Sequence, residues 1–508
     1  MNQRKAGVIL SYISMGLHSV IALVYVPMLL YYLSKDQFGI YQLMGSMLSY
    51  LYLMDFGLAN TTTRYLAQAL SLADKQRERN IIAASHTLYT GIALLVVLVG
   101  IIFYLCVPLI YSSSLSPADL HTAKQICLIL LLNIAVFIPS RIFTAVINAH
   151  ERFLFGRGLG VLQTCLHPLL VWGILAWKAS VINLVIVQTC TVFANILLQY
   201  LYCKIKLHTS FPLLLHKSPL FKELTGFSVF VFLHSLMDQV YSRSGQLILG
   251  AVVGVLAVTN YSIAMQVAMF AICLPVMMSS VFLPKLSASV AKQHNLTQCN
   301  DLFCKLGRLQ FMLFMLLIGG FAFLGKTFLL LWIGPGYNVC YWIVLILFGG
   351  YLIDVTQNVG IPILQALKKH AFRAYIYTAM AALNIVLAIV LSKFYGEIGC
   401  AVATASCLIL GSGFIINWYY WHIGIDIWTF FKNLGKLSIP ILGALGIIWE
   451  LFLLWPLHTS WISFIFHGSV LTVVYTSILW KFACNSYEKN LILIPLQQII
   501  STLKKNQK

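Results

Sequence analysis

The sequence has little charge, and acidic residues are especially scarce. Only 9% of its 508 residues are charged, and 14 acidic residues stand against 33 lysines and arginines. Soluble globular domains carry roughly 25% charge. The chain is 60% hydrophobic, with a mean hydropathy of +0.88. Because the apolar excess extends over the full length, the composition excludes a soluble domain on one anchor and predicts a polytopic membrane protein.

Paired cysteines, a strand pattern and long polar connections are also lacking. The 12 cysteines include no C-x-x-C pair, so we interpret them as small buried hydrophobic residues and predict no metal site and no cofactor. Without a strand pattern, helices are the remaining way to satisfy the backbone in lipid. The longest external connection, about 111–124, is too short for a catalytic domain, and the cytoplasmic loops near 204–225 and 284–308 are too short for an ATPase. Energy would then come from a coupling cation (H⁺ or Na⁺), the membrane potential or a partner.

Apolar runs long enough to cross a bilayer recur along the whole chain. Arg4 and Lys5 before the first run resemble a signal peptide, but the run is too long and lacks a cleavage site. The fold class is therefore all-α integral membrane with about 14 transmembrane helices. The predicted spans are 8–32, 39–60, 82–110, 125–147, 158–177, 181–203, 226–249, 256–283, 309–333, 341–366, 374–394, 398–421, 438–457 and 461–483.

The distribution of basic residues tests this count independently. With Arg4 and Lys5 in the cytoplasm, nearly all other lysines and arginines fall in the connections after even-numbered spans and in the tail. This alternation predicts a cytoplasmic-membrane protein with both termini in the cytoplasm. It also explains the net charge of +19 as topology, so no nucleic-acid partner is expected. The exceptions are Lys35, Lys124, Lys178, Lys326, Lys393 and Arg243.

The spans contain an internal repeat with an offset of about 220 positions. Gly39-Ile40-Tyr41 corresponds to Asn260-Tyr261, and the basic residue Arg64 corresponds to Lys285. Six spans is an even number, so the two copies would be parallel six-helix bundles with a site between them. The predicted domains are 1–222, 223–436 and a terminal helix pair with the tail at 437–508.

Polar residues inside the spans are the candidate substrate or cavity residues, because an unpaired charge in lipid is costly. The alternatives are hydrogen bonding between helices for the amides and snorkelling to the interface for Arg64 and Arg141. Asp354, Asn358 and Gln365 are predicted on one stripe of span ten. The principal candidates are Arg243, Asp238, Asp55, Asp354, Arg64 and Arg141. The secondary polar candidates are His234, Asn358, Gln365, Gln163 and His167.

Residues 320–327 match the phosphate-loop pattern G-x-x-x-x-G-K-[ST]. A functional phosphate loop joins a strand to a helix in a soluble α/β domain. This segment lies inside span nine, so nucleotide binding is not expected, and Lys326 is interpreted as snorkelling to the outer interface.

Short motifs carry a resemblance to a known family. They are Phe38-Gly39-Ile40-Tyr41, Asp55-Phe56-Gly57-Leu58 and Arg64-Tyr65-Leu66, with Asn260-Tyr261 in the second half. Together with the topology, they resemble the polysaccharide transporter family of O-antigen and capsule repeat-unit flippases. That family shares a superfamily with multidrug and toxin extrusion proteins and lipid II flippases.

The resemblance implies two bundles in a V around a cation-lined cavity. The substrate would be an undecaprenyl-pyrophosphate-linked oligosaccharide, which is turned to the outer leaflet for surface polysaccharide biosynthesis. Arg243, Arg64 and Arg141 suit a pyrophosphate because guanidinium binds phosphate oxygens bidentately. Membrane lipids and polysaccharide assembly proteins are the other partners implied.

Two alternatives come from other classes. A cation-coupled multidrug exporter would tend to have an acid in the first span, and none is present there. A membrane-embedded polysaccharide-modifying enzyme would need a large external loop or a catalytic histidine in a polar setting.

Overall fold

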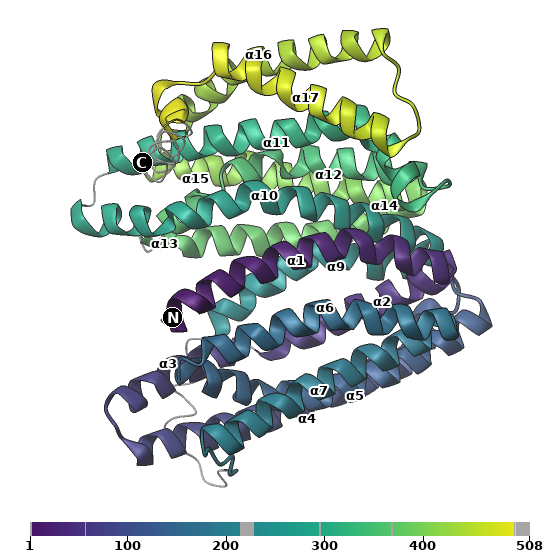
Figure 1. Cartoon of the computed structure of the whole chain (residues 1–508), viewed down its shortest axis with the longest axis vertical. Helices are drawn as coiled ribbons and strands as arrows, with labels where there is room; N and C mark the ends of the chain where they lie inside the picture. Colours follow the sequence, from purple (N-terminus) through teal and green to yellow (C-terminus); the bar gives the residue numbers. More distant parts are fainter. Residues whose placement is uncertain are drawn as a thin grey trace, which may run out of the picture. The chain divides into compact units, whose positions relative to one another are not determined.

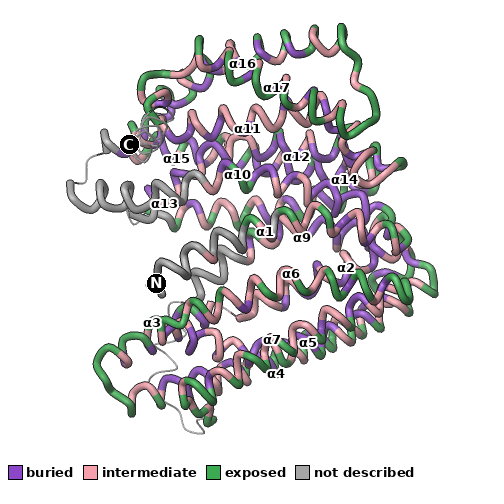
Figure 2. The backbone as a smooth tube through the Cα atoms, viewed as in Figure 1, coloured by how far each residue is buried: buried purple, intermediate pink, exposed green. Residues whose placement is uncertain are grey.

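The computed structural model describes residues 3–55, 57–213, 228–293, 296–366, 369–491 and 493. The all-α prediction is confirmed, because these residues form helices and the turns between them (Figure 1). In this part of the chain ten helices are long and apolar enough to cross a membrane. The total of 14 therefore stays a prediction. Figure 2 shows exposed residues along the length of helices such as α4 and α16, and many of them are leucine, isoleucine and tryptophan.

The chain divides into two compact units. Unit 1 comprises 1–263 and 385–400, and unit 2 comprises 264–384 and 401–508. The predicted boundary at 222/223 lies outside the described residues, and the predicted repeat domains stay a prediction.

Unit 1 is built from long helices that pack in neighbouring pairs. The contacting pairs include α1 with α6, α4 with α5, α5 with α7, and α2 with both α5 and α9. The helices are α1 (Gln3–Tyr32), α2 (Lys35–Tyr52), α3 (Leu58–Ser71), α4 (Lys75–Tyr111), α5 (Pro117–Ala149), α6 (Phe153–Trp177), α7 (Val181–Lys206), α9 (Ser228–Val252) and the start of α10 (Val255–Gln293).

Unit 2 is organised around α11, which packs against α12, α16 and α17. Its buried core is aliphatic and aromatic, with Phe303, Tyr420 and Phe430 all nearly inaccessible. The helices are the rest of α10, α11 (Leu296–Ile333), α12 (Asn338–Thr356), α13 (Gly360–Ala366), α14 (His370–Leu408, of which 385–400 belongs to unit 1), the π-helix η2 (Ile409–Ile415), α15 (Ile416–His422), α16 (Ile427–Leu454) and α17 (Trp461–Phe482).

Two predicted spans, two and ten, are not continuous helices with the expected boundaries. Span two breaks after Tyr52 into the short 3₁₀ helix η1 (Leu53–Asp55), and α3 begins after Gly57. Gly57 has φ 68°, a left-handed conformation that favours glycine. Span ten ends with α12 at Thr356. Spans eleven and twelve follow one another without a loop, and the break between them is the non-helical Gly396.

The glycine in the first sequence motif has a packing role. A Cβ on Gly39 would lie 2.5 Å from Val255 Cγ1 at the start of α10, so only glycine permits this close approach. Nearby, the Thr259 hydroxyl donates to the Lys35 carbonyl at 2.6 Å. The repeat landmarks 39–41 and 260–261 are therefore on segments that contact each other within unit 1.

The phosphate-loop pattern is wholly helical. Its residues lie inside α11, and Lys326 Nζ is 5.1 Å from the centre of the Tyr341 ring and 5.7 Å from that of Trp342. A helix lacks the open backbone that cradles a phosphate. Aromatic rings are typical of the membrane interface, and the position of Lys326 at the outer interface stays a prediction.

Candidate functional site

The break in span two positions the first acidic candidate. Asp55 ends η1, and its Oδ2 is 3.4 Å from Arg141 Nε on α5. The Asp55 side chain is 13% exposed and that of Arg141 is 33% exposed. The Tyr89 hydroxyl lies near the same carboxylate. Neither this hydroxyl nor Asp55 Oδ1 has a hydrogen bond of ordinary geometry among the described residues, although both are buried. The pair is thus incompletely satisfied.

Arg141 keeps most of its donor capacity. A guanidinium has five N–H groups, and among the described residues only Nε of Arg141 forms a side-chain hydrogen bond, to Asp55. The group also lies 5.6 Å from the centre of the Phe137 ring. Since one third of the side chain is accessible, its terminal nitrogens are free to bind an anion.

Arg243 lies on α9, which runs antiparallel to α2. The Tyr50 hydroxyl donates to the Gln239 carbonyl at 3.3 Å, and Gly250 further along α9 faces Leu43. Between these contacts Arg243 is partly buried and interacts electrostatically with the hydroxyls of Tyr41 and Tyr50. It forms no ion pair with a described acid. Because α2 packs against both α5 and α9, Arg141 and Arg243 are carried by helices that flank the same helix.

Five of the six principal candidates fall in unit 1, but they do not form one cluster. Arg64 is exposed on α3, and Asp238 is exposed on α9. The sixth, Asp354, belongs to unit 2. The structure therefore places Asp55 with Arg141 and leaves Arg64 at a solvent- or headgroup-accessible position.

In unit 2, Asp354 is paired with a residue that the sequence analysis assigned to a loop. Arg373 lies in the first turns of α14, is only 9% exposed, and its Nη2 is 3.2 Å from Asp354 Oδ1. Arg373 also donates to the hydroxyls of Tyr420 at 3.0 Å and Tyr377 at 2.7 Å. Tyr377 and Ser412, the latter at 2.9 Å, donate in turn to Asp354 Oδ1. Arg373 follows two lysines in the sequence, so charge alone could not separate it from the loop.

The secondary candidates of span ten are not arranged as predicted. Asp354 lies in the last turn of α12, whereas Asn358 lies in the turn between α12 and α13. The prediction of one stripe for Asp354, Asn358 and Gln365 is wrong, because the helix ends between them. The side chains of Gln365 and His234 lie outside the described residues.

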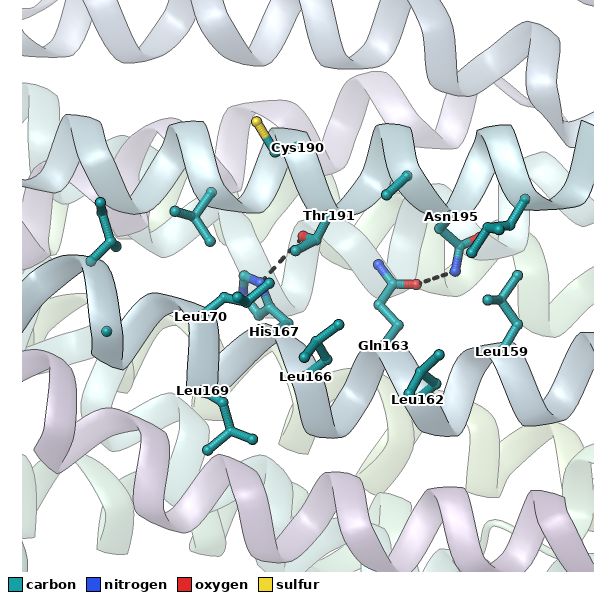
Figure 3. A pocket seen from close by; sticks show the side chains of 15 residues that line it. Leu159, Leu162, Gln163, Leu166, His167, Leu169, Leu170, Cys190, Thr191 and Asn195 are labelled. Carbon is teal, nitrogen blue, oxygen red and sulfur yellow. Dashed lines mark hydrogen bonds between the residues drawn. The ribbon is translucent and has the colours of Figure 1, made fainter.

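Gln163 and His167 lie together on α6 and contact polar residues of α7 (Figure 3). The Asn195 amide donates to Gln163 Oε1 at 2.6 Å, and the Thr191 hydroxyl is 3.4 Å from His167 Nδ1. On its other side, His167 Nε2 is 3.3 Å from the Tyr25 hydroxyl on α1. These two candidates line a cavity and also join helices, so both sequence interpretations describe part of their role.

The α7 partners were not among the residues predicted from sequence. Gln188 accepts from Tyr41 at 3.2 Å, and Gln199 accepts from Thr144 at 2.8 Å and donates to Asn195 at 2.5 Å. Their spacing is the signal that could have found them, since steps of three and four residues put side chains on one helical face. The row comprises Gln188, Thr191, Asn195 and Gln199.

Metal binding has no support in the part of the chain that the structure describes. There, no group of three or more His, Cys, Asp or Glu side chains could hold a metal ion. The chemistry available in unit 1 is instead that of arginine donors, tyrosine hydroxyls and amides in an apolar surrounding.

Comparisons with known proteins agree on family and fold. Residues 5–290, more than half of the chain, match the family described as "Polysaccharide biosynthesis protein". No curated protein matches in a sequence search.

Among solved structures, a lipid II flippase MurJ in an inward closed conformation matches with a TM-score of 0.69 at 16% identity, over 94% of this chain and 98% of that one. An inward-facing multidrug resistance MATE family transporter of the MOP superfamily matches with a TM-score of 0.62 at 12% identity, over 83% of this chain and 98% of that one. The chain therefore belongs to the polysaccharide biosynthesis protein family, as a multi-pass membrane protein with the fold of flippases and transporters.

Proposed function

We propose that this protein is a flippase that moves a polyprenyl-pyrophosphate-linked oligosaccharide across the cytoplasmic membrane for surface polysaccharide biosynthesis, serving an O-antigen or a capsule. The family and the fold support a flippase or transporter. The observation that carries the substrate class is the partly accessible Arg141, whose terminal guanidinium nitrogens have no partner among the described residues.

A pyrophosphate is the part of such a substrate that is hardest to move through lipid, because its charge must stay solvated or paired. Arginine is suited to this task, since its planar donors bind phosphate oxygens bidentately and it remains charged. Arg141 and Arg243 flank α2 in the apolar part of unit 1. In the proposal these two bind the pyrophosphate, and the exposed Arg64 attracts it at the cytoplasmic surface.

The remaining features of the proposal follow from topology. Both termini lie in the cytoplasm, the substrate enters from the inner leaflet, and a coupling cation such as H⁺ or Na⁺, or the membrane potential, supplies the energy. Membrane lipids and polysaccharide assembly proteins are the other partners.

Deleting the gene and analysing lipid-linked glycans by mass spectrometry tests the proposal. The deletion strain should accumulate a polyprenyl-pyrophosphate-linked oligosaccharide and lose surface polysaccharide, and the wild-type gene should reverse both. Arg243→Ala and Arg141→Ala, at normal protein level, should fail to reverse them. Arg157→Ala, which removes an exposed arginine at the start of α6, is the matched control and should behave as wild type.

Two results would contradict the proposal. One is normal surface polysaccharide with Arg243→Ala and Arg141→Ala both present at wild-type level. The other is a deletion strain with unchanged lipid-linked glycans but raised sensitivity to cationic drugs, which would support the multidrug exporter instead.

A further inference from the structure

An elongated groove lies between α6 and α7 in unit 1, away from the Asp55–Arg141 pair. Its volume is about 600 Å³. Figure 3 shows leucine side chains along it and two polar pairs between the helices. Several of these leucines are exposed at the protein surface, including Leu162 at 55% and Leu169 at 63%. The main apolar residues are Leu159, Leu162, Leu166, Leu169, Leu170 and Leu198.

The groove extends over most of the thickness of a bilayer core. Its lining on α6 runs from Leu159 to Ile174, which at 1.5 Å per residue is about 22 Å. The hydrocarbon core of a bilayer is about 30 Å thick. An occupant must therefore be long and apolar, and it must lie along the helices rather than cross them.

A polar group in the middle of the groove makes it different from an ordinary lipid-facing seam. Gln163 uses its oxygen to accept from Asn195. The Gln163 amide nitrogen forms no hydrogen bond in the described part of the chain, and Figure 3 shows it beside the groove. The His167 ring lies one turn further along the same wall, held by Thr191 and Tyr25. N–H donors and ring faces at this depth tolerate a chain with π electrons better than a saturated one.

We infer that the α6/α7 groove binds the polyprenyl chain of the lipid-linked substrate. This inference rests on the proposed function and extends it to the lipid half of the substrate. The chain must stay in the apolar phase while the head group crosses, and a groove that runs along the membrane normal provides that phase next to α1 and α5. Each isoprene unit carries a double bond that can face the Gln163 amide and the His167 ring.

Other occupants fit less well. The ester carbonyls of a phospholipid lie near the membrane interface, so they cannot reach an amide donor at the middle of a span. A sugar would leave many hydroxyls against leucine, at a cost for each unpaired polar group. Binding of a phospholipid acyl chain is therefore the principal competing outcome of the test.

Filling the groove provides the functional test. Gly173 lines the groove, and a Cβ added to it would meet no heavy atom within 4 Å, so Gly173→Leu introduces bulk without a backbone clash. Gly91 on α4 is also an exposed helical glycine with open space around it, and Gly91→Leu is the matched control. In the complemented deletion strain, Gly173→Leu should lower the clearance of lipid-linked oligosaccharide at least fivefold, and Gly91→Leu should not change it.

Photocrosslinking identifies the occupant. A benzophenone amino acid at Leu169 in the groove is compared with one at Leu98 on α4, which is similarly exposed at 60%. Polyprenyl adducts at position 169, several-fold above those at 98, would support the inference. Equal polyprenyl yields at both positions, phospholipid adducts alone, or a Gly173→Leu variant that clears substrate normally would overturn it.

The two proposals fail separately. If the wild-type gene restores clearance but the groove results are negative, the groove inference is wrong and the flippase proposal stands. If the deletion strain accumulates no lipid-linked oligosaccharide, the proposed function fails and the groove inference fails with it.

Discussion

Each unit contains an acid–arginine pair in which the acid lies at a helix break, Asp55–Arg141 in unit 1 and Asp354–Arg373 in unit 2, and these two pairs differ in how many hydrogen bonds they form. In unit 2, Arg373 binds Asp354 and two tyrosines, and Asp354 also accepts from Tyr377 and Ser412. In unit 1, Arg141 has one contact of 3.4 Å with Asp55, whose other oxygen is buried without a hydrogen bond among the described residues. We call Asp354–Arg373, which is held by several hydrogen bonds, the closed pair. We call Asp55–Arg141, in which the arginine keeps unbonded N–H groups, the open pair.

This difference separates a structural role from a binding role. Arg373 already uses three of its five N–H groups and is buried, so it has few donors left for a ligand, and removing one partner of such a pair leaves the other charge unpaired. A pair with free N–H groups and an accessible arginine can exchange its partner for a phosphate at small cost. We therefore expect the Asp354–Arg373 pair to stabilise unit 2, and under the proposed function we expect the Asp55–Arg141 pair to bind the substrate.

The largest effect is expected from opening the closed pair. Arg373→Ala should lower the free energy of unfolding by about 3–5 kcal/mol, because it leaves Asp354 and two tyrosine hydroxyls without their common donor. Thermal unfolding of the purified protein in mild detergent measures this, with Arg141→Ala as the comparison from the other unit. An Arg373→Ala variant that unfolds at the wild-type temperature but fails to transport would contradict the structural role of this pair.

Arg141→Ala should have the opposite profile. We expect substrate clearance to fall at least tenfold, which corresponds to about 1.4 kcal/mol. The loss of stability should be smaller than for Arg373→Ala, because Arg141 is one third exposed and has a single contact of 3.4 Å with Asp55. Clearance of lipid-linked oligosaccharide in the complemented deletion strain and thermal unfolding of the same variant give both quantities. If Arg141→Ala lowers the free energy of unfolding but leaves clearance per folded protein unchanged, this pair is also structural.

The fold was largely predictable because lipid allows few solutions. Long apolar runs and alternating basic connections predicted an all-helical membrane protein, and the helices of unit 1 follow those runs closely. The breaks inside spans two and ten were not predicted from hydropathy. Polar residues such as Asp55 and Asn358 lie beside the breaks at Gly57 and Thr356, but an apolar average over a whole span hides them. The kink at Gly396 falls between the predicted spans 374–394 and 398–421.

The candidate site was only partly predictable, because sequence gives depth in the membrane but not the facing partner. Asp55 and Arg141 were both chosen as isolated charges, and their pairing depends on how η1 packs near α5. Arg373 was missed because a loop and the first turn of a helix have the same composition. The polar row on α7 has helical spacing, but uncharged amides cost less in lipid than charges do and are therefore a weaker signal.

A subtler test concerns the acid of the open pair. Asp55→Asn keeps the size of the side chain but removes the charge that orients Arg141. We expect clearance to fall about fivefold, equivalent to about 1 kcal/mol, which is less than for Arg141→Ala because the guanidinium itself remains. The ratio of the two clearance rates is the measurement, and a larger loss for Asp55→Asn would make the acid the principal functional group.

The smallest effect is expected from removing one hydrogen bond to Asp354 while its ion pair with Arg373 remains. Ser412 lies in the π-helix η2, is 3% exposed, and contributes one of several hydrogen bonds to Asp354. Ser412→Ala should cost about 1 kcal/mol of stability and leave transport unchanged, since Tyr377 and Arg373 still hold the carboxylate. Ser438→Ala on α16, whose hydroxyl bonds only its own helix, is the matched control and should cost less. Thermal unfolding of the two variants measures this difference. If Ser412→Ala loses nearly as much stability as Arg373→Ala, the hydrogen bonds around Asp354 are cooperative and each of them is needed.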